Sequence, residues 1–166
     1  SLEKEIITFR RSYEQSHLIE RKEADKVALV TGSSKGLGRA ILLDLARDHK
    51  VVIHYNKSSD DAKNTFAEAR KLNSAMIVRA DLKDEEQVKK MFAKIESKFG
   101  GVDVLVNNVG DFVYTNMDKI TTKEFKNTIE GNLYSSWNCI KEVLPYMRKK
   151  GGRIILASLR KIYGKT

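Results

Sequence analysis

The chain has 166 residues, of which 41% are hydrophobic and 32% charged. It has no signal-peptide pattern and no apolar run near the ~20 residues that cross a bilayer. One globular domain without a membrane span is expected, and a single cysteine, Cys139, excludes an internal disulfide and suits the cytoplasm. The net charge of +9 comes mostly from residues 148–166. It favours a solvated basic face or an acidic substrate over nucleic acid, since no nucleic-acid-binding motif accompanies it.

Residues 1–24 are expected to form a helical extension. Leu2, Ile6, Phe9 and Tyr13 fall at helical spacing on one stripe, opposite charged residues. The balanced charge of this stretch favours packing on its own domain or on a partner subunit over binding at a membrane surface. Residues 25–166 are then expected to form the main domain.

Strand and helix patterns alternate along the main domain. Strands are expected over 27–31, 51–55, 75–79, 102–106 and 153–157, and helices over 37–48, 60–72, 84–99 and 121–148. Asp84-x-x-Gln87 and Thr121-x-x-Glu124 match capping boxes at the starts of the last two helices. Helical crossovers between strands require parallel pairing. The expected fold is therefore α/β, a doubly wound Rossmann-type sheet of about five strands in the order 3-2-1-4-5.

A glycine-rich segment directly follows the first predicted strand and opens the first helix of this sheet. It reads Thr31-Gly32-Ser33-Ser34-Lys35-Gly36-Leu37-Gly38. Glycine lets the backbone turn sharply and approach a ligand, and the free N–H groups of a first helical turn attract phosphate. The segment therefore predicts a site for the diphosphate of a dinucleotide, with a glycine turn that binds nothing as the alternative. The three histidines lack metal-ligand spacing and are expected to be structural or surface residues, so no metal site is predicted.

Four further motifs follow in order: Ala80-Asp81-Leu82, Asn107-Asn108-Val109-Gly110, Gly131-Asn132-Leu133 and Gly152-Arg153-Ile154-Ile155. Together with the glycine segment they resemble the motifs of the short-chain dehydrogenase/reductases. The resemblance covers about residues 26–158, and within that family it is closest to the 3-oxoacyl-thioester reductases. It implies a nicotinamide cofactor, a small-molecule or acyl-thioester substrate, and assembly as a homo-oligomer.

The resemblance also implies which residues contact the cofactor. The glycine segment would hold the diphosphate, and Asp81 would accept a hydrogen bond from the adenine amino group. The implied contacts are Gly32, Ser34, Lys35, Gly36, Leu37, Gly38, Tyr55, Asn56, Lys57, Ser58, Ala80, Asp81, Leu82, Asn108, Val109 and Gly110. The plainer alternative is that Asp81 is a turn residue and that the two asparagines are a polar strand end.

Charge at the end of the second strand favours NADP(H) over NAD(H). Enzymes that prefer NAD place an acidic residue there to bind the ribose 2′-hydroxyl. Here the stretch is Tyr55-Asn56-Lys57-Ser58, with no acid before Asp60. A 2′-phosphate would meet no opposing charge and could bind Lys35 and Lys57. The alternative is that both are ordinary surface lysines.

The catalytic residues that the resemblance implies are only partly matched. Asn132 matches the family's asparagine, which supports a water-linked proton path. The family's serine polarises the carbonyl, and counted from Arg153 it falls one residue beyond Ser158. The family's tyrosine donates the proton and has a lysine four residues later on the same helix face. Tyr163-Gly164-Lys165 places the lysine at i+2 instead, so Tyr163 is interpreted as a coincidence.

The leading hypothesis is an NADPH-dependent reductase of a carbonyl such as a 3-oxoacyl thioester. Impaired turnover is expected, because no Tyr-x-x-x-Lys follows the fifth strand. That strand would also be an exposed parallel edge, so the sheet is expected to be incomplete on its C-terminal side and the chain to be a fragment of a longer reductase. The alternative is a nucleotide-binding module without catalysis.

Overall fold

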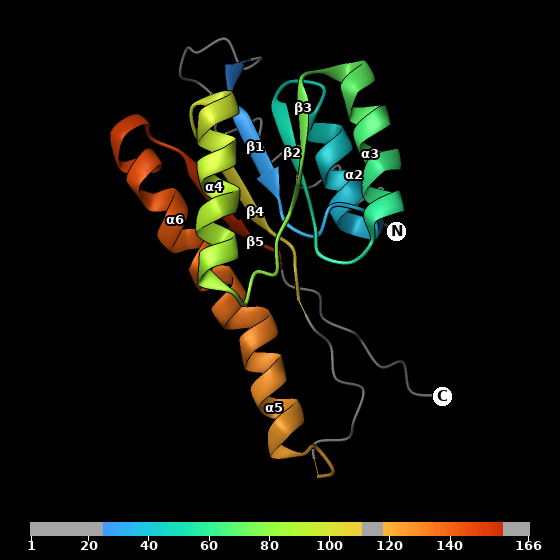
Figure 1. Ribbon diagram of the computed structural model, residues 1–166, viewed down its shortest axis with the longest axis vertical. Helices are drawn as coiled ribbons and strands as arrows, with labels where there is room; N and C mark the ends of the chain where they lie inside the picture. The colour runs from blue at the N-terminus through green and yellow to red at the C-terminus, as the bar shows by residue number, and fades with distance from the viewer. Residues whose placement is uncertain (1–24, 111–117, 158–166) are drawn as a thin grey trace.

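The computed structural model describes residues 25–110 and 118–157, and these residues build one five-stranded sheet (Figure 1). Its strand order is β3-β2-β1-β4-β5, and every neighbouring pair is parallel. The predicted α/β class and strand order are therefore confirmed. The strands are β1 (Val27–Val30), β2 (Lys50–Tyr55), β3 (Ala75–Arg79), β4 (Val104–Asn107) and β5 (Arg153–Leu156).

Helices cover both faces of the sheet (Figure 1). One face carries α2 (Gly36–Leu45) and α3 (Ser59–Leu72), and the other carries α4 (Glu85–Phe99) and α6 (Ser135–Lys150). Before α6 the chain forms α5 (Thr122–Ile129) and a π-helical turn, η2 (Glu130–Tyr134). Figure 1 shows α5 projecting past the carboxyl ends of the strands. None of the helices within the described ranges is long and apolar enough to cross a bilayer.

The central strand explains why the sheet needs two helical layers. All four residues of β1 are buried, and alternate residues point to opposite faces. Val27 and Leu29 join the cluster under α4 and α6, whereas Ala28 and Val30 join the cluster under α2 and α3. A strand buried on both faces is a continuous apolar run, and this is the pattern that the sequence presents.

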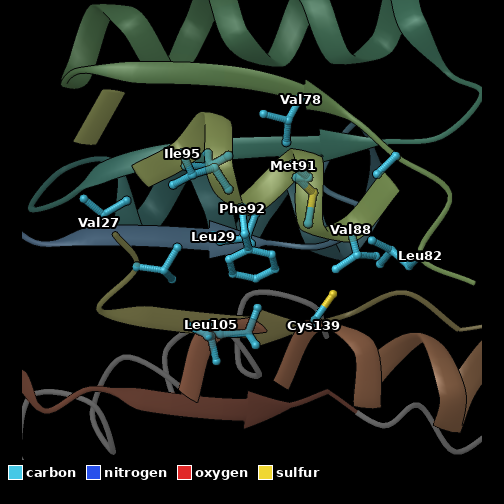
Figure 2. Close-up of a cluster of buried hydrophobic side chains, with 14 residues drawn as sticks. Val27, Leu29, Val78, Leu82, Val88, Met91, Phe92, Ile95, Leu105 and Cys139 are labelled. Atoms are coloured by element: carbon cyan, nitrogen blue, oxygen red, sulfur yellow. The ribbon is translucent and has the colours of Figure 1, made fainter. Parts of the chain in front are cut away.

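Phe92 of α4 is the largest fully buried side chain of the core (Figure 2). In Figure 2 it lies beside Leu29, with Leu105 and Cys139 across from it. Burial raises the pKa of the Cys139 thiol to about 12, so this cysteine stays protonated and acts as a small apolar core residue.

One of the two predicted capping boxes is complete. The Thr121 hydroxyl accepts from the Glu124 N–H, and the Glu124 carboxylate accepts from the Thr121 N–H. The prediction at Asp84 is only half correct. Its carboxylate does accept from the N–H groups of Glu86 and Gln87, but the Gln87 amide oxygen accepts from the Asp81 N–H instead.

Three predicted boundaries were wrong for local reasons. The first helix ends at Leu45, since the Arg47 and Asp48 N–H groups turn to carbonyls three residues back. The fourth strand starts at Val104, where its ladder with β1 begins. The predicted helix over 121–148 is interrupted by η2 and continues to Lys150. The predicted helix over residues 1–24 lies outside the described residues.

The last described strand is an edge, as expected. Within residues 25–110 and 118–157, β5 pairs with β4 alone, and Leu156 at its end is 61% exposed. Because an edge strand leaves backbone donors and acceptors on one side, it can accept a further strand.

Replacement of Phe92 by alanine should lower the free energy of unfolding by about 3–5 kcal/mol, because the cavity it leaves lies between two packed layers. Leu72→Ala is the control: Leu72 is 50% exposed on α3, and its loss should change stability by less than about 0.5 kcal/mol. Urea unfolding of the two variants measures the difference. Equal effects would contradict the placement of Phe92 in the core.

Candidate dinucleotide-binding site

The carboxyl ends of four parallel strands bring the predicted cofactor residues to one edge of the sheet (Figure 1). The glycine loop, defined as residues 31–38, follows β1 and leads into α2. Residues 56–58 follow β2, residues 80–82 follow β3, and residues 108–110 follow β4. Ligands of doubly wound folds bind at this edge, at the point where the strand order reverses on either side of β1.

Glycines shape the loop in two different ways. Gly32 and Gly36 have φ values of +63° and +59°, a region that L side chains rarely adopt. Gly38 instead allows close packing, since a Cβ there would lie 2.5 Å from the Gly32 carbonyl oxygen and 2.5 Å from Asn108 Nδ2. The start of α2 is thereby pressed against the turn that follows β1.

The segment that follows β4 holds the loop through hydrogen bonds between Thr31 and Asn108. The Thr31 hydroxyl oxygen accepts from the N–H groups of Asn108 (2.9 Å) and Val109 (3.1 Å). In return, Asn108 Nδ2 donates to the Thr31 carbonyl at 3.1 Å. The Asn108 side chain, to which the resemblance assigns a cofactor contact, thus supports the loop. Its contact with a cofactor stays a prediction.

On the other side of β1, strand β2 holds the loop through His54, which is 2% exposed. Ser33 and His54 exchange two hydrogen bonds, from the Ser33 N–H to the His54 carbonyl and from the His54 N–H to Ser33 Oγ. The Gly32 N–H donates to His54 Nδ1 at 3.0 Å. Farther along the loop, the Thr65 hydroxyl of α3 donates to the Ser34 carbonyl at 2.9 Å. Sequence reasoning missed these roles, although a histidine inside an apolar strand next to a glycine loop was a usable signal.

The His54 imidazole is neutral at physiological pH. Burial lowers its pKa from 6.5 to about 4, against the opposite effects of the Ala80 carbonyl and the Asp81 carboxylate. Its Nε2 lies 3.1 Å from the Ala80 carbonyl oxygen, which can only accept. The hydrogen-bond network therefore assigns the proton to Nε2 and leaves Nδ1 to accept from Gly32.

Lysine charge lies beside the loop. A groove of about 490 Å³ is lined by the loop, α2 and α3, and Lys35 lies in its wall. Lys35 Nζ is 3.9 Å from Asp61 Oδ2, but both side chains are at least half exposed, so this ion pair is weak and can be replaced by another anion. Arg39, in contrast, is bound at 2.6 Å by both carboxylate oxygens of Glu68.

Within the described ranges, no cluster of His, Cys, Asp or Glu could hold a metal ion.

The predicted adenine segment is a turn with a defined carboxylate. Asp81 Oδ1 accepts from the Lys83 N–H at 3.0 Å, and the Asp81 N–H donates to Gln87. These contacts support the turn interpretation of Asp81. Its role toward adenine stays a prediction.

Asn132 lies in η2 and reaches the segment that follows β4. Its Nδ2 donates to the Thr128 carbonyl at 2.8 Å, and a Cβ on Gly110 would lie 2.5 Å from Asn132 Oδ1. The long helix and the Asn-Asn-Val-Gly segment therefore touch at this asparagine, which is exposed. Ser158 and Tyr163 lie outside the described residues.

A Tyr-x-x-x-Lys pair does occur in the sequence, at Tyr146 and Lys150, but at the wrong end of the sheet. Both residues line a cavity of about 310 Å³ next to Gly101 and Gly151, at the amino ends of β4 and β5. Burial and the hydrogen bond from the phenol to Glu96 raise the pKa of Tyr146 to about 12. A proton donor needs a pKa nearer neutrality, so this pair does not fit the role of the family's catalytic tyrosine and lysine.

Comparison with known proteins identifies the family. The model of the short chain dehydrogenase family matches residues 26–160. The chain belongs to the short-chain dehydrogenase family. The resemblance of the motifs is thereby confirmed.

Curated relatives and a solved structure agree with this assignment. A 3-oxoacyl-[acyl-carrier-protein] reductase of Staphylococcus epidermidis is 37% identical over 134 residues, 79% of this chain and 55% of the relative. A short chain dehydrogenase/reductase of Aspergillus aculeatus, AacuN, is 34% identical, with 81% and 52% covered. The X-ray structure of an alcohol dehydrogenase from Thermococcus sibiricus, complexed with 5-hydroxy-NADP, matches with a TM-score of 0.74 and 30% identity, over 79% of this chain and 57% of that one. The chain thus spans about half the length of the curated relatives it matches.

Gly38→Ala should destabilise the fold by about 3 kcal/mol, because the new methyl group would overlap the Gly32 backbone. Gly36→Ala is the control. A Cβ there meets no atom within 4 Å, so it should cost only about 1 kcal/mol for the unfavourable φ. Urea unfolding of both variants measures the two costs, and a Gly38→Ala no less stable than Gly36→Ala would contradict the close packing.

The His54 pKa predicts how stability depends on pH. The His54 imidazole has a pKa of 6.5 in the unfolded chain and of about 4 in the folded chain. The free energy of unfolding should therefore fall as the pH decreases between these two values. The contribution of this one group approaches about 1.4 kcal/mol per pH unit within the window. Urea unfolding of the wild type and of His54→Asn between about pH 4.5 and about pH 7 measures this contribution. Equal pH slopes in the two proteins would contradict a buried neutral imidazole.

Proposed function

We propose that this chain binds NADP(H) at the carboxyl edge of its sheet. The loop amides from Ser34 to Gly38 would hold the diphosphate at the start of α2, and Asp81 would accept from the adenine amino group. The observation that carries the proposal is the glycine loop itself, fixed on both sides and ending at a helix N-terminus. Bound there, the cofactor would supply a hydride.

The described residues fit such a ligand. A Cβ added to Gly36 meets no described atom within 4 Å, so the outer side of the loop is open where a phosphate would approach. The weakly held Lys35 lies next to it and Lys57 is exposed at the end of β2, with no acidic side chain between Tyr55 and Ser58. The related alcohol dehydrogenase was solved with 5-hydroxy-NADP, which supports a phosphorylated dinucleotide here.

We further propose carbonyl reduction, with a 3-oxoacyl thioester as the substrate class, for the protein to which these residues belong. Relatives at 36–37% identity are 3-oxoacyl-[acyl-carrier-protein] reductases, and Asn132, to which the resemblance assigns a role in a proton path, lies against the segment after β4. The 166 residues carry no Tyr-x-x-x-Lys after β5. Loss of acid–base catalysis typically lowers a rate by ~10²–10⁴-fold, so we expect them to bind the cofactor and turn over slowly.

Self-association is part of the proposal. Exposed apolar side chains recur every four residues through α5, η2 and α6, and their exposed fractions run from 42% to 66%. They are Phe125, Ile129, Leu133 and Trp137. A stripe of this kind on one helix face is typical of a protein contact. We propose that it packs in a homo-oligomer, as the family resemblance implies.

A binding module without catalysis is the second candidate. The hydrogen bonds that fix the loop come from β2, β4 and α3, and none of them depends on a catalytic tyrosine or lysine. The loop can therefore hold a dinucleotide whether or not reduction follows.

Cofactor preference tests the proposal. NADPH should bind more tightly than NADH, and Lys35→Gln and Lys57→Gln should each weaken NADPH by about tenfold while leaving NADH unchanged. Lys63→Gln, an exposed lysine of α3 paired with Asp60, is the matched control. Fluorescence titration gives all the affinities. NADH binding as tight as that of NADPH would contradict the assignment.

Turnover separates the two candidate functions. With acetoacetyl thioester and NADPH, the chain should consume the reduced cofactor at least about 10²-fold more slowly than a 3-oxoacyl reductase that carries the full Tyr-x-x-x-Lys set. Absorbance of the reduced nicotinamide follows the reaction. Slow but measurable reduction supports a weakened enzyme, and tight binding with no reduction supports the binding module. Turnover equal to that of the complete reductase would contradict the role given to the missing pair.

A further inference from the structure

His54 connects two parts of the proposed cofactor site that lie on different strands. Its Nδ1 is 3.0 Å from the Gly32 nitrogen in the loop after β1. Its Nε2 is 3.1 Å from the carbonyl oxygen of Ala80, the residue before Asp81 after β3. One ring therefore spans from the diphosphate loop to the adenine segment, through the strand between them.

We propose that His54 is a positioning residue, whose neutral Nε2–H imidazole sets the separation between the glycine loop and the adenine segment. This inference rests on the proposed binding of NADP(H). The residue would not touch the cofactor: it is buried beneath the loop, and its contacts are to backbone atoms. It would act by fixing where the loop amides and the Asp81 carboxylate stand before a ligand arrives.

The backbone of the loop shows why an acceptor is needed at this point. Gly32 has a positive φ, and its N–H points away from the ladder of β1 to His54 Nδ1. Without that acceptor, a half-buried donor would lose its partner, and the loop would have to move for the N–H to find another. The two bonds between Ser33 and the His54 backbone hold the next residue, so the ring fixes the first peptide of the turn and the backbone fixes the second.

The chemistry of the ring makes the two contacts depend on one another. If Nδ1 carried the proton, it would face the Gly32 N–H as a second donor, and Nε2 would face the Ala80 carbonyl as a second acceptor. A charged ring would lose the Gly32 contact as well. Burial opposes the charge, and among the described residues the charged group that acts on the ring is the Asp81 carboxylate, which favours it. The low pKa that results keeps the required tautomer across the physiological range.

Two substitutions of His54 each retain one of the two hydrogen-bonding groups of the ring and remove the other. In His54→Asn the amide oxygen replaces Nδ1 and can still accept from Gly32, but nothing reaches Ala80. In His54→Gln the longer side chain places an amide N–H near the former Nε2, and the acceptor for Gly32 is lost. Val52→Ala is the control for destabilisation alone, because Val52 is a buried residue of the same strand that packs in the core under α4 and α6.

The experiment uses the full chain, with NADPH as the probe, and combines titration with NMR of the histidine ring and of the Gly32 amide. His54→Gln should weaken NADPH by about tenfold and speed hydrogen exchange at Gly32. His54→Asn should retain slower Gly32 exchange and tighter binding than His54→Gln. Val52→Ala should lose stability but leave both the Gly32 exchange, corrected for stability, and the affinity unchanged.

The outcomes distinguish this inference from the proposed function. The wild-type ring should give the nitrogen shifts of the Nε2–H tautomer, with no titration near 6.5. An Nδ1–H ring, or a His54→Gln variant with wild-type Gly32 exchange, would overturn the inference whether or not NADPH binds. A wild type with the expected tautomer and protected Gly32 that fails to bind NADPH would instead overturn the proposed function.

Discussion

The site depends on one constraint: the turn at Gly32 needs side-chain partners, because the Gly32 N–H has no backbone acceptor among the described contacts of the sheet and α2 begins only at Gly36. Gly32 turns the chain out of the strand with a positive φ, and its N–H donates to a side chain, whereas the N–H groups of Thr31 and Ser33 still donate to backbone carbonyls of the flanking strands. Thr31 and Asn108 bind the turn from the β4 side, and the His54 ring binds it from the β2 side. Because each buried donor or acceptor costs free energy when unpaired, this network leaves the loop one favourable position.

That position suits the loop to the phosphate site that we propose. The Gly38 contact with the Gly32 carbonyl presses the first turn of α2 against the fixed peptides, so the N–H groups at the start of the helix are placed by the sheet. Binding a diphosphate there would require little ordering of the loop, which favours affinity. Lys35 and Lys57 are exposed beside this edge, and in our proposal their charge discriminates between dinucleotides by binding a 2′-phosphate.

The sequence predicted the fold well because the signals were local and consistent. Apolar strands, helix caps and the glycine loop fix the element order, and crossover geometry then fixes parallel pairing. The support of the loop was not predictable in the same way. His54 and Asn108 act through residues 22 and 77 positions away, contacts that no local pattern reports. The π-helical turn at Asn132 was also missed, because a helical pattern does not distinguish an extra residue in one turn.

Motif spacing alone does not identify catalytic residues in this chain. Tyr146 and Lys150 have the spacing of the family's acid and its lysine, yet they lie at the amino ends of the strands, with the phenol bound to Glu96. Spacing puts two side chains on one helix face, and only the placement of that helix decides what they face. Asn132 differs from this pair because it lies against Gly110, at the carboxyl edge of the sheet where we propose that the cofactor binds.

A crystal structure with NADP⁺ bound tests the central claim most directly. The account predicts the diphosphate over the amides of residues 34–38, the 2′-phosphate between Lys35 and Lys57, and the Gly32 N–H still directed at His54. A dinucleotide bound at the opposite edge of the sheet, or a loop that has left His54 to receive it, would contradict the account.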